Sequence, residues 1–441
     1  MYLRLVLSYC YTLIEEVAMQ PLRGFRDITA PDTLLWRYIE QILIDLSCQY
    51  GYDEVRLPLL EDLSLFQRSV GEHTDIVGKE MYQFNDANEQ AIALRPEGTA
   101  GAVRAMINNG ICSRLVAKWW YLGPMFRRER PQKGRYRQFT QFGIEYFGIS
   151  DIASDIELLN LSYLALRKLK LEQHVSLSIN YLPGKENKSA YTKKLVNYLE
   201  GHIDLLDDDS KNRIQTNPLR IFDSKDASTQ AVLKNAPPLS GALTEEELAI
   251  ISYLKTQLNE LGIKFTWDEG LVRGLDYYQG VVFEWTTDHL GAQGTVCGGG
   301  RYDRLSEILG AKPWPATGLS FGIDRLVLLM NELGITPPTA ERAMVIAPSN
   351  LSTRAQNIQS QLIQHFEQTF MLCHQFSSTK KSIQRAQKQS IRFVVILDES
   401  GQHLTIKDLI SNQSTEISTN DIDKLPTKLH DCFDPKGVSD E

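Results

Sequence analysis

One short segment of the chain carries six basic residues and a single acid. It runs from Phe126 to Arg137, and its basic residues are Arg127, Arg128, Arg130, Lys133, Arg135 and Arg137. Like charges packed so closely repel one another unless an anion lies nearby, and arginine forks match phosphate oxygens in a bidentate geometry. The segment is either a solvated charged loop or an anion-binding one, and the aromatic residues on both sides favour the second interpretation.

A carboxylate is held between two special residues in a second segment, where Glu97 stands between Pro96 and Gly98. Proline restricts the backbone and glycine lets a ligand approach it, so Glu97 could bind an ammonium group. The same pattern also suits a helix N-terminus near Thr99. The sequence leaves both possibilities open.

An arginine and two adjacent tyrosines occur together in a third segment, Leu271–Tyr278. Arg273 could hold an anion, while Tyr277 and Tyr278 offer hydroxyl groups and flat ring faces. Adjacent side chains of a strand point to opposite faces, so both tyrosines can serve one pocket only if the segment is a loop.

Two glycine-containing segments follow. Gly298, Gly299 and Gly300 either let a flat ligand lie on the backbone or mark a tight crossing of strands. Thr317–Leu326 indicates a strand that leads into a helix with Arg325 in its first turn, a geometry that favours anions. Neither segment is a Walker loop or a dinucleotide fingerprint, so phosphate binding here would depend on arginines.

Hydrophobic spacing predicts the elements that would position these segments. Residues 33–50 and 155–170 have the period of helices, and Ala117–Leu122 with Phe139–Phe147 predicts a long antiparallel hairpin whose tip is the basic segment. Shorter elements are predicted as strands at Tyr52–Leu57, His174–Ile179, Phe265–Trp267, Val281–Trp285 and Gly294–Cys297, and as a helix at Tyr302–Leu309.

The order of the elements predicts separate domains. Residues 19–184 and 263–335 form two parts of one domain, interrupted by a charged helical insertion over residues 185–262. After a proline-containing linker, alternating strands and helices predict a small α/β domain over residues 341–433. No function is assigned to residues 1–18: their short apolar stretch is faintly like a signal peptide, but no cleavage pattern follows it.

Composition limits the class of protein. The 441 residues carry a formal net charge of −8, so contacts with nucleic acid would have to come from local basic patches on an acidic body. No apolar run is long enough to span a bilayer. The six cysteines are scattered without metal-ligand spacing, which predicts reduced thiols in the cytoplasm and no metal site.

Taken together, the segments resemble the class II aminoacyl-tRNA synthetases, and specifically the histidyl family. Gly51–Pro58, Phe126–Phe147 and Gly318–Leu326 resemble the three motifs of the class. The segments that resemble the histidyl signatures are Leu271–Tyr278, Gly298–Asp303 and Arg130–Phe139. The resemblance implies an α+β fold: an antiparallel-sheet catalytic domain with a helical insertion, followed by an anticodon-binding α/β domain.

The resemblance also implies a function and its residues. The chain would activate histidine with ATP, release pyrophosphate and transfer histidine to the 3′ end of tRNA(His), as a homodimer that uses ATP with Mg²⁺. Arg273 and Arg127 would be catalytic. The implied histidine-binding residues are Glu97, Gly98, Thr99, Arg127, Gln141, Glu145, Arg273, Tyr277 and Tyr278. The implied ATP-binding residues are Arg127, Glu129, Arg135, Tyr136, Phe139 and Arg325. The implied tRNA-binding residues are Arg130, Gln132, Lys380, Lys381, Arg385 and Lys388.

Two other classes of protein compete with this interpretation. Synthetase-like regulatory subunits of the first enzyme of histidine biosynthesis share the fold without the charging reaction. As a family they tend to lack the C-terminal domain and to lose the arginine signature. This chain has the predicted C-terminal domain and retains Arg127, Arg273 and Arg325. A nucleic-acid-binding module without enzymatic activity would not account for Glu97, Glu145 and the tyrosine pair, which are poorly suited to phosphate.

Overall fold

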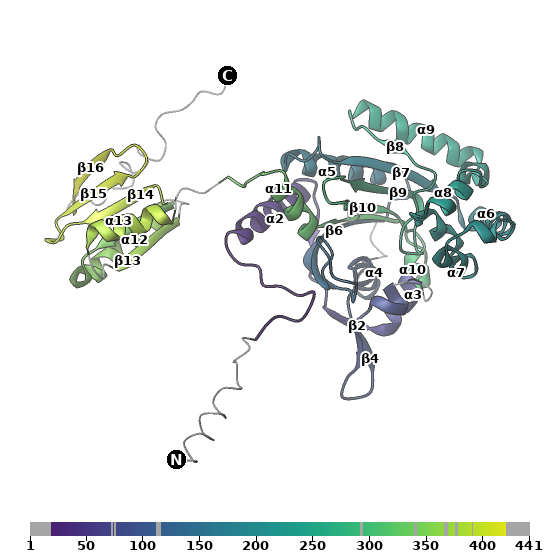
Figure 1. Cartoon of the computed structure of the whole chain (residues 1–441), viewed down its shortest axis with the longest axis horizontal. Helices are drawn as coiled ribbons and strands as arrows, with labels where there is room; N and C mark the ends of the chain where they lie inside the picture. Colours follow the sequence, from purple (N-terminus) through teal and green to yellow (C-terminus); the bar gives the residue numbers. More distant parts are fainter. Residues whose placement is uncertain are drawn as a thin grey trace, which may run out of the picture. The chain divides into compact units, whose positions relative to one another are not determined.

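The computed structural model describes residues 19–71, 74, 76–111, 116–291, 294–338, 342–365, 369–374, 378–389 and 391–419. The chain divides into two compact units, Met1–Pro337 and Pro338–Glu441, each with its own sheet (Figure 1). Residues 1–18, for which no function was predicted, and residues 420–433 of the expected C-terminal domain lie outside the described residues.

An eight-stranded sheet forms the centre of the first unit, in the order β1-β5-β6-β11-β10-β9-β7-β8. Neighbouring strands from β5 to β7 are antiparallel, and only the outer pairs β1/β5 and β7/β8 are parallel. The strands are β1 (Asp53–Glu54), β5 (Ala117–Phe126), β6 (Gln138–Phe147), β7 (Ser176–Leu182), β8 (Thr266–Trp267), β9 (Gln279–Thr286), β10 (Thr295–Arg301) and β11 (Ala316–Gly322).

Helices from distant parts of the sequence cover the two faces of this sheet. One buried cluster joins strand residues such as Phe142 and Phe283 with α2 (Asp32–Gln49), α5 (Ala153–Lys168), α9 (Glu245–Glu260) and α11 (Ile323–Glu332). A second cluster joins Tyr121 and Val282 with α4 (Thr99–Asn108), α6 (Lys185–Glu200), α7 (Asp208–Thr216), α8 (Ala227–Leu233) and α10 (Leu305–Ile308). The unit therefore has a sheet between two helical layers.

A small sheet and several short helical turns complete the first unit. The sheet has the order β2-β4-β3, from β2 (Leu60–Asp62), β3 (Gln83–Asn85) and β4 (Ala91–Leu94). It packs with α3 (Leu63–Val70) and the π-helical turn Ile76–Glu80. Three 3₁₀ turns, Ile203–Leu205, Pro218–Asp223 and Leu239–Ala242, join the helices of residues 185–262.

The second unit holds a five-stranded sheet in the order β13-β12-β14-β15-β16. Its elements are β12 (Arg342–Ala347), α12 (Ser352–His365), β13 (Thr369–His374), α13 (Thr379–Lys388), β14 (Phe393–Leu397), β15 (His403–Asp408) and β16 (Ser414–Ser418). The first three strands are parallel, with helices between them in the sequence, and the last two form an antiparallel hairpin that the sequence analysis did not predict.

The predicted α+β class is confirmed, and two short elements are corrected. The strand predicted at Tyr52–Leu57 is only Asp53–Glu54, which pairs with β5; Val55 N–H still donates to the Trp120 carbonyl, and Pro58 has no N–H to continue the pairing. The helix predicted at Tyr302–Leu309 is only Leu305–Ile308, since Tyr302 pairs its backbone with Ala316 instead. Among the described residues, no helix is both long and apolar enough to cross a membrane.

Candidate active site

A cleft opens over the middle strands of the central sheet and encloses about 960 Å³ of space between atoms, part of which is open to solvent. Its walls come from β5, β6, β10 and β11, from the β5–β6 connection, and from the loop before β9. The sequence-predicted residues that line it are Glu97, Thr99, Arg127, Glu129, Arg135, Tyr136, Phe139, Gln141, Arg273, Tyr277, Tyr278 and Arg325. Segments far apart in the sequence thus meet in one site.

Four arginines surround the same cleft: Arg127, Arg135, Arg273 and Arg325. Burial lowers the pKa of Arg325, and the positive charges of Arg127 and Arg135 lower it further. Two structural contacts orient Arg325, whose Nε donates to the carbonyl of Gly134 at 3.1 Å and whose Nη1 donates to the carbonyl of Thr295 at 2.7 Å. Crowded guanidinium groups that repel one another are the electrostatic setting of an anion site.

Arg273 lines the cleft from the loop before β9. Its guanidinium forms an ion pair with Glu284 and lies 5.7 Å from the ring centroid of Tyr278. Burial alone would lower the pKa of Arg273, but Glu284 and the tyrosines outweigh it and raise the pKa above its usual range. A Cβ at Gly298 would lie 2.7 Å from the guanidinium, so this glycine leaves the room that Arg273 occupies.

Glu97 caps a helix N-terminus, which is one of the two roles that the sequence left open, and its side chain also lines the cleft. Its carboxylate accepts the backbone N–H of Thr99 at 2.6 Å and that of Ala100 at 2.9 Å, which caps the start of α4, and it also lines the cleft. Burial raises its pKa, while these two N–H groups and the charge of Arg127 oppose the rise. The carboxylate is thereby fixed in position with lone pairs left for a further donor.

The tyrosine pair lies in a loop, as its use in one pocket requires. Residues 271–278 form neither helix nor strand, and the rings of Tyr277 and Tyr278 both line the cleft with centroids 4.7 Å apart. Both side chains are buried.

Glu145 lies directly behind the cleft wall and is not among the lining residues. Its carboxylate accepts hydrogen bonds from Thr99 Oγ1 at 2.8 Å, from the Tyr121 hydroxyl at 3.0 Å and from the Tyr302 hydroxyl. A Cβ at Gly318 would overlap this carboxylate, so only glycine fits there. Burial raises the pKa of Glu145 to about 8, although the three hydroxyl donors oppose the rise.

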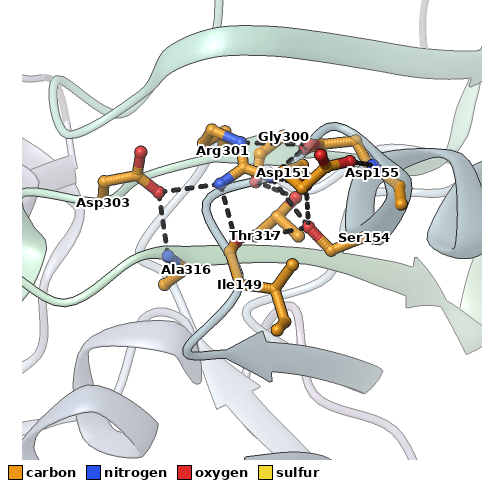
Figure 2. A network of polar contacts seen from close by, with 10 residues as sticks. Ile149, Asp151, Ser154, Asp155, Gly300, Arg301, Asp303, Ala316 and Thr317 are labelled. Carbon is orange, nitrogen blue, oxygen red and sulfur yellow. Dashed lines mark hydrogen bonds and ion pairs between the residues drawn. The ribbon is translucent and has the colours of Figure 1, made fainter. Parts of the chain in front are cut away.

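A buried arginine fixes the position of Tyr302 in this network. Figure 2 shows Arg301 beside the first turn of α5, where it donates to the carboxylate of Asp155 and, at 2.8 Å, to Ser154 Oγ. It also donates to Asp303 Oδ1 at 3.1 Å. Asp155 is fully buried, so its charge needs this partner. The ion pair ties the end of β10 to α5 and so holds the next residue, Tyr302, under Glu145.

Sequence reasoning missed a pair of charges, Arg26 and Asp324, beside Tyr136 of the cleft. Arg26 forms a 2.9 Å ion pair with Asp324, and its guanidinium lies 4.0 Å from the ring centroid of Tyr136. Asp324 in turn accepts the backbone N–H of Thr140 at 2.7 Å. Tyr136 and Asp324 line the cleft. The only signal in the sequence was an arginine in an N-terminal segment without a predicted element.

If Tyr136 binds ATP, as the resemblance implies, Arg26→Ala should raise the KM for ATP about tenfold, since the substitution removes a cation–π interaction and a part-buried ion pair beside Tyr136. The KM for histidine should change much less. The measurement is pyrophosphate exchange with each substrate varied in turn. Arg23→Ala is the matched control, because its side chain is exposed. Equal increases in both constants would show a general defect and contradict a role specific to the nucleotide.

Other predicted residues do not line the cleft. Gly98 is the residue that precedes α4, while Arg130 and Gln132 lie on the β5–β6 connection outside the lining residues. Four more are exposed on α13 of the second unit: Lys380, Lys381, Arg385 and Lys388. Residues of the lining that sequence reasoning did not select include Tyr121, Thr295, Cys297 and Ser320.

Comparison with known proteins decides the family. The family model of histidyl-tRNA synthetases matches residues 24–326, more than half of the chain. The chain belongs to this family. A histidine–tRNA ligase of Marinomonas sp. (strain MWYL1) is 42% identical over 417 residues, which cover 93% of this chain and 98% of the relative.

Solved structures of synthetases share the fold. The apo histidyl-tRNA synthetase of S. aureus superimposes with a TM-score of 0.75 at 30% identity, covering 93% of this chain and 99% of that one. A Bacillus halodurans structure described as an ATP phosphoribosyltransferase regulatory subunit/histidyl-tRNA synthetase gives a TM-score of 0.62 at 20% identity, over 86% of this chain and 98% of that one. The fold alone therefore does not separate a synthetase from a regulatory relative, and the site must do so.

Proposed function

We infer that this protein is a histidine–tRNA ligase, which forms histidyl-adenylate from histidine and ATP and then transfers histidine to tRNA(His). The observation that carries this inference is one cleft that joins Glu97 and the tyrosine pair with Arg127, Arg273 and Arg325. Such a site can bind an amino acid and a triphosphate side by side. A regulatory subunit does not form an adenylate, so it would not need cations around the α-phosphate of ATP.

The first step is the attack of the histidine carboxylate on the α-phosphorus of ATP. A bond forms between carboxylate oxygen and phosphorus, the bond to the β-phosphate oxygen breaks, and pyrophosphate leaves with the electron pair. Charge is redistributed over the phosphoryl oxygens, and fixed cations stabilise it without covalent chemistry by the protein. Arg127 and Arg273 take this role at the α-phosphate, and Arg325 binds the γ-phosphate.

Histidine occupies the part of the cleft that contains carboxylates and hydroxyls. Glu97, Thr99 and Gln141, with the backbone of Gly98, hold its α-amino group. Tyr278 and the Glu145 network recognise the imidazole nitrogens, and Tyr277 closes the pocket. A site that pairs both ring nitrogens rejects an isostere lacking one by up to about 10⁴–10⁵.

ATP occupies the arginine-rich part, where Glu129, Arg135, Tyr136 and Phe139 surround the nucleoside. Mg²⁺ enters with ATP as part of the substrate. Phosphate oxygens are ligands that Mg²⁺ prefers, so ATP would supply most of its coordination.

Transfer to tRNA completes the reaction. A ribose hydroxyl at the 3′ end of tRNA(His) attacks the carbonyl carbon of the adenylate, and AMP leaves. Arg130 and Gln132 on the β5–β6 connection contact the acceptor end. The second unit binds the anticodon through α13. The protein acts as a homodimer, which the likeness of Gly51–Pro58 to the interface motif of the class supports. Its place of action is the cytoplasm.

The test is histidine-dependent exchange of labelled pyrophosphate into ATP by the purified full chain. Exchange that requires histidine, together with charging of tRNA(His), establishes the ligase. A folded protein without exchange would instead indicate a regulatory relative.

Glu145→Gln should raise the KM for histidine more than the KM for ATP. A carboxylate, directly or through the hydroxyls that donate to it, is a stronger acceptor for an imidazole N–H than an amide. Because the pKa of Glu145 is raised to about 8, the affinity for histidine should also depend on pH. Below pH 8 the carboxyl of the empty site is protonated and must lose its proton to accept, so histidine affinity should improve as pH rises towards 8.

The variant provides the control for this dependence. Between pH 7 and 8 free imidazole is already mostly neutral, so the remaining pH effect belongs to the protein. Calorimetric titration of histidine should show that effect in the wild type and a flat profile in Glu145→Gln. The same slope in both proteins would assign the titration to another group.

A further inference from the structure

The loop of residues 271–278 packs against the helical insertion, residues 185–262. The loop forms neither helix nor strand, yet it carries Arg273, Tyr277 and Tyr278 into the cleft. The side chain of Val272 is buried in the same apolar cluster as Leu219 and other insertion residues. The position of the loop therefore depends on the insertion as well as on the sheet.

Two polar contacts fasten the far end of the loop to the insertion. Lys188 of α6 donates from Nζ to the carbonyl oxygen of Tyr278 at 3.2 Å. Asn217, the residue after α7, donates from Nδ2 to Asp276 Oδ1 at 2.7 Å. A second cleft, with about 710 Å³ of empty space, lies between the insertion and the loop and shares Arg273 with the first.

The end of α3 supports Asp276 from another direction. The backbone N–H of Asp276 donates to the carbonyl of Val70 at 3.3 Å. A Cβ at Gly71, whose φ is +103°, would overlap the Asp276 carboxylate, so the close approach needs glycine. Asp276 thus joins three parts of the unit: α3, the loop and the insertion.

We propose that the helical insertion stabilises the histidine pocket. Lys188 and Asn217, which we call the clamp, hold the loop of residues 271–278 in the conformation that binds histidine. The proposal rests on the inferred role of Tyr277 and Tyr278 in binding histidine. If the clamp favours the binding-competent loop, histidine must in turn favour the docked insertion by the same factor. Lys188 and Asn217 are then positioning residues, which touch the loop and not the substrate.

The decisive variant is Asn217→Asp in the full chain, compared with the exchanged pair Asn217→Asp with Asp276→Asn. The single change places two carboxylates within hydrogen-bond reach and should raise the KM for histidine about tenfold, with little change for ATP. The exchanged pair restores one amide–carboxylate bond in the opposite direction. It should recover most of the histidine KM, which a merely misfolded protein would not do.

Matched variants on the exposed side of α6 complete the design. Lys188→Met should weaken histidine binding, while Lys193→Met and Asn197→Asp, both at exposed positions, should not. Amide hydrogen exchange of α6 and α7 should slow when histidine binds to the wild type, and slow less in Asn217→Asp. These results together would support reciprocal stabilisation.

The failures of the clamp and of the proposed function are distinguishable. A wild-type protein silent in histidine-dependent pyrophosphate exchange would remove the proposed function. An active wild type would overturn the clamp alone in either of two cases: if Asn217→Asp kept the histidine KM or raised both KM values equally, or if the exchanged pair failed to restore it.

Discussion

Arg273→Ala is expected to reduce adenylate formation by at least about 10²–10³, the usual cost of one preorganised charge at a reacting centre. The side chain lines the cleft between the inferred histidine and ATP positions, and Gly298 leaves space for its guanidinium. The loss should appear mainly in kcat, because the arginine acts on charge that develops at the α-phosphate. Single-turnover formation of adenylate measures this step without tRNA.

Two further variants separate catalysis from stability at this position. Arg273→Ala leaves the Glu284 carboxylate without its ion-pair partner, although Thr295 Oγ1 still donates to it at 3.0 Å. The double variant Arg273→Ala with Glu284→Gln removes that unpaired charge and should recover thermal stability but no activity. Arg273→Lys should recover only part of the rate, since lysine lacks the planar fork. Near-normal exchange by a folded Arg273→Ala protein would refute the catalytic assignment.

Elements with a long, regular pattern could be predicted from the sequence. The helix Asp32–Gln49 and the hairpin Ala117–Phe126 with Gln138–Phe147 follow hydrophobic spacing over many residues, which is the strongest local signal of secondary structure. The small sheet β2-β4-β3 could not be predicted. Its strands are three or four residues long and mostly exposed, so they show no alternation of buried and exposed positions.

The residues of the site that lie beneath the cleft wall also could not be predicted from the sequence. Tyr121 and Tyr302 resemble ordinary core aromatics in the sequence, and only the fold shows that their hydroxyls meet at Glu145. Arg26 reaches Asp324 across almost 300 positions of the chain. Such pairs depend on tertiary contacts between segments that carry no common motif. By contrast, Arg273 and the tyrosine pair stand in one short segment, so their shared site could be expected.

Ending the chain after Pro338 is expected to separate the two half-reactions. The first unit contains the whole cleft, so the shortened protein should still form adenylate. Charging of tRNA should fall sharply, because α13 is removed. That helix exposes Lys380, Lys381, Arg385 and Lys388, and no acid occurs between Phe376 and Val394 in an otherwise acidic chain. A local basic face of this kind is suited to phosphate contacts.

Charge variants in the full chain test the same role with the second unit kept in place. Lys381→Ala with Arg385→Ala should weaken tRNA binding and lower the slope of log affinity against log salt by roughly 0.7–0.9 for each phosphate that the protein no longer neutralises. Pyrophosphate exchange should be unchanged, because Lys381 and Arg385 lie outside the unit that holds the cleft. Arg167→Ala with Lys168→Ala on α5 is the matched control, since both side chains are exposed basic groups of the first unit. If charging survived both the truncation and the α13 changes at wild-type efficiency, the second unit would have no part in tRNA recognition.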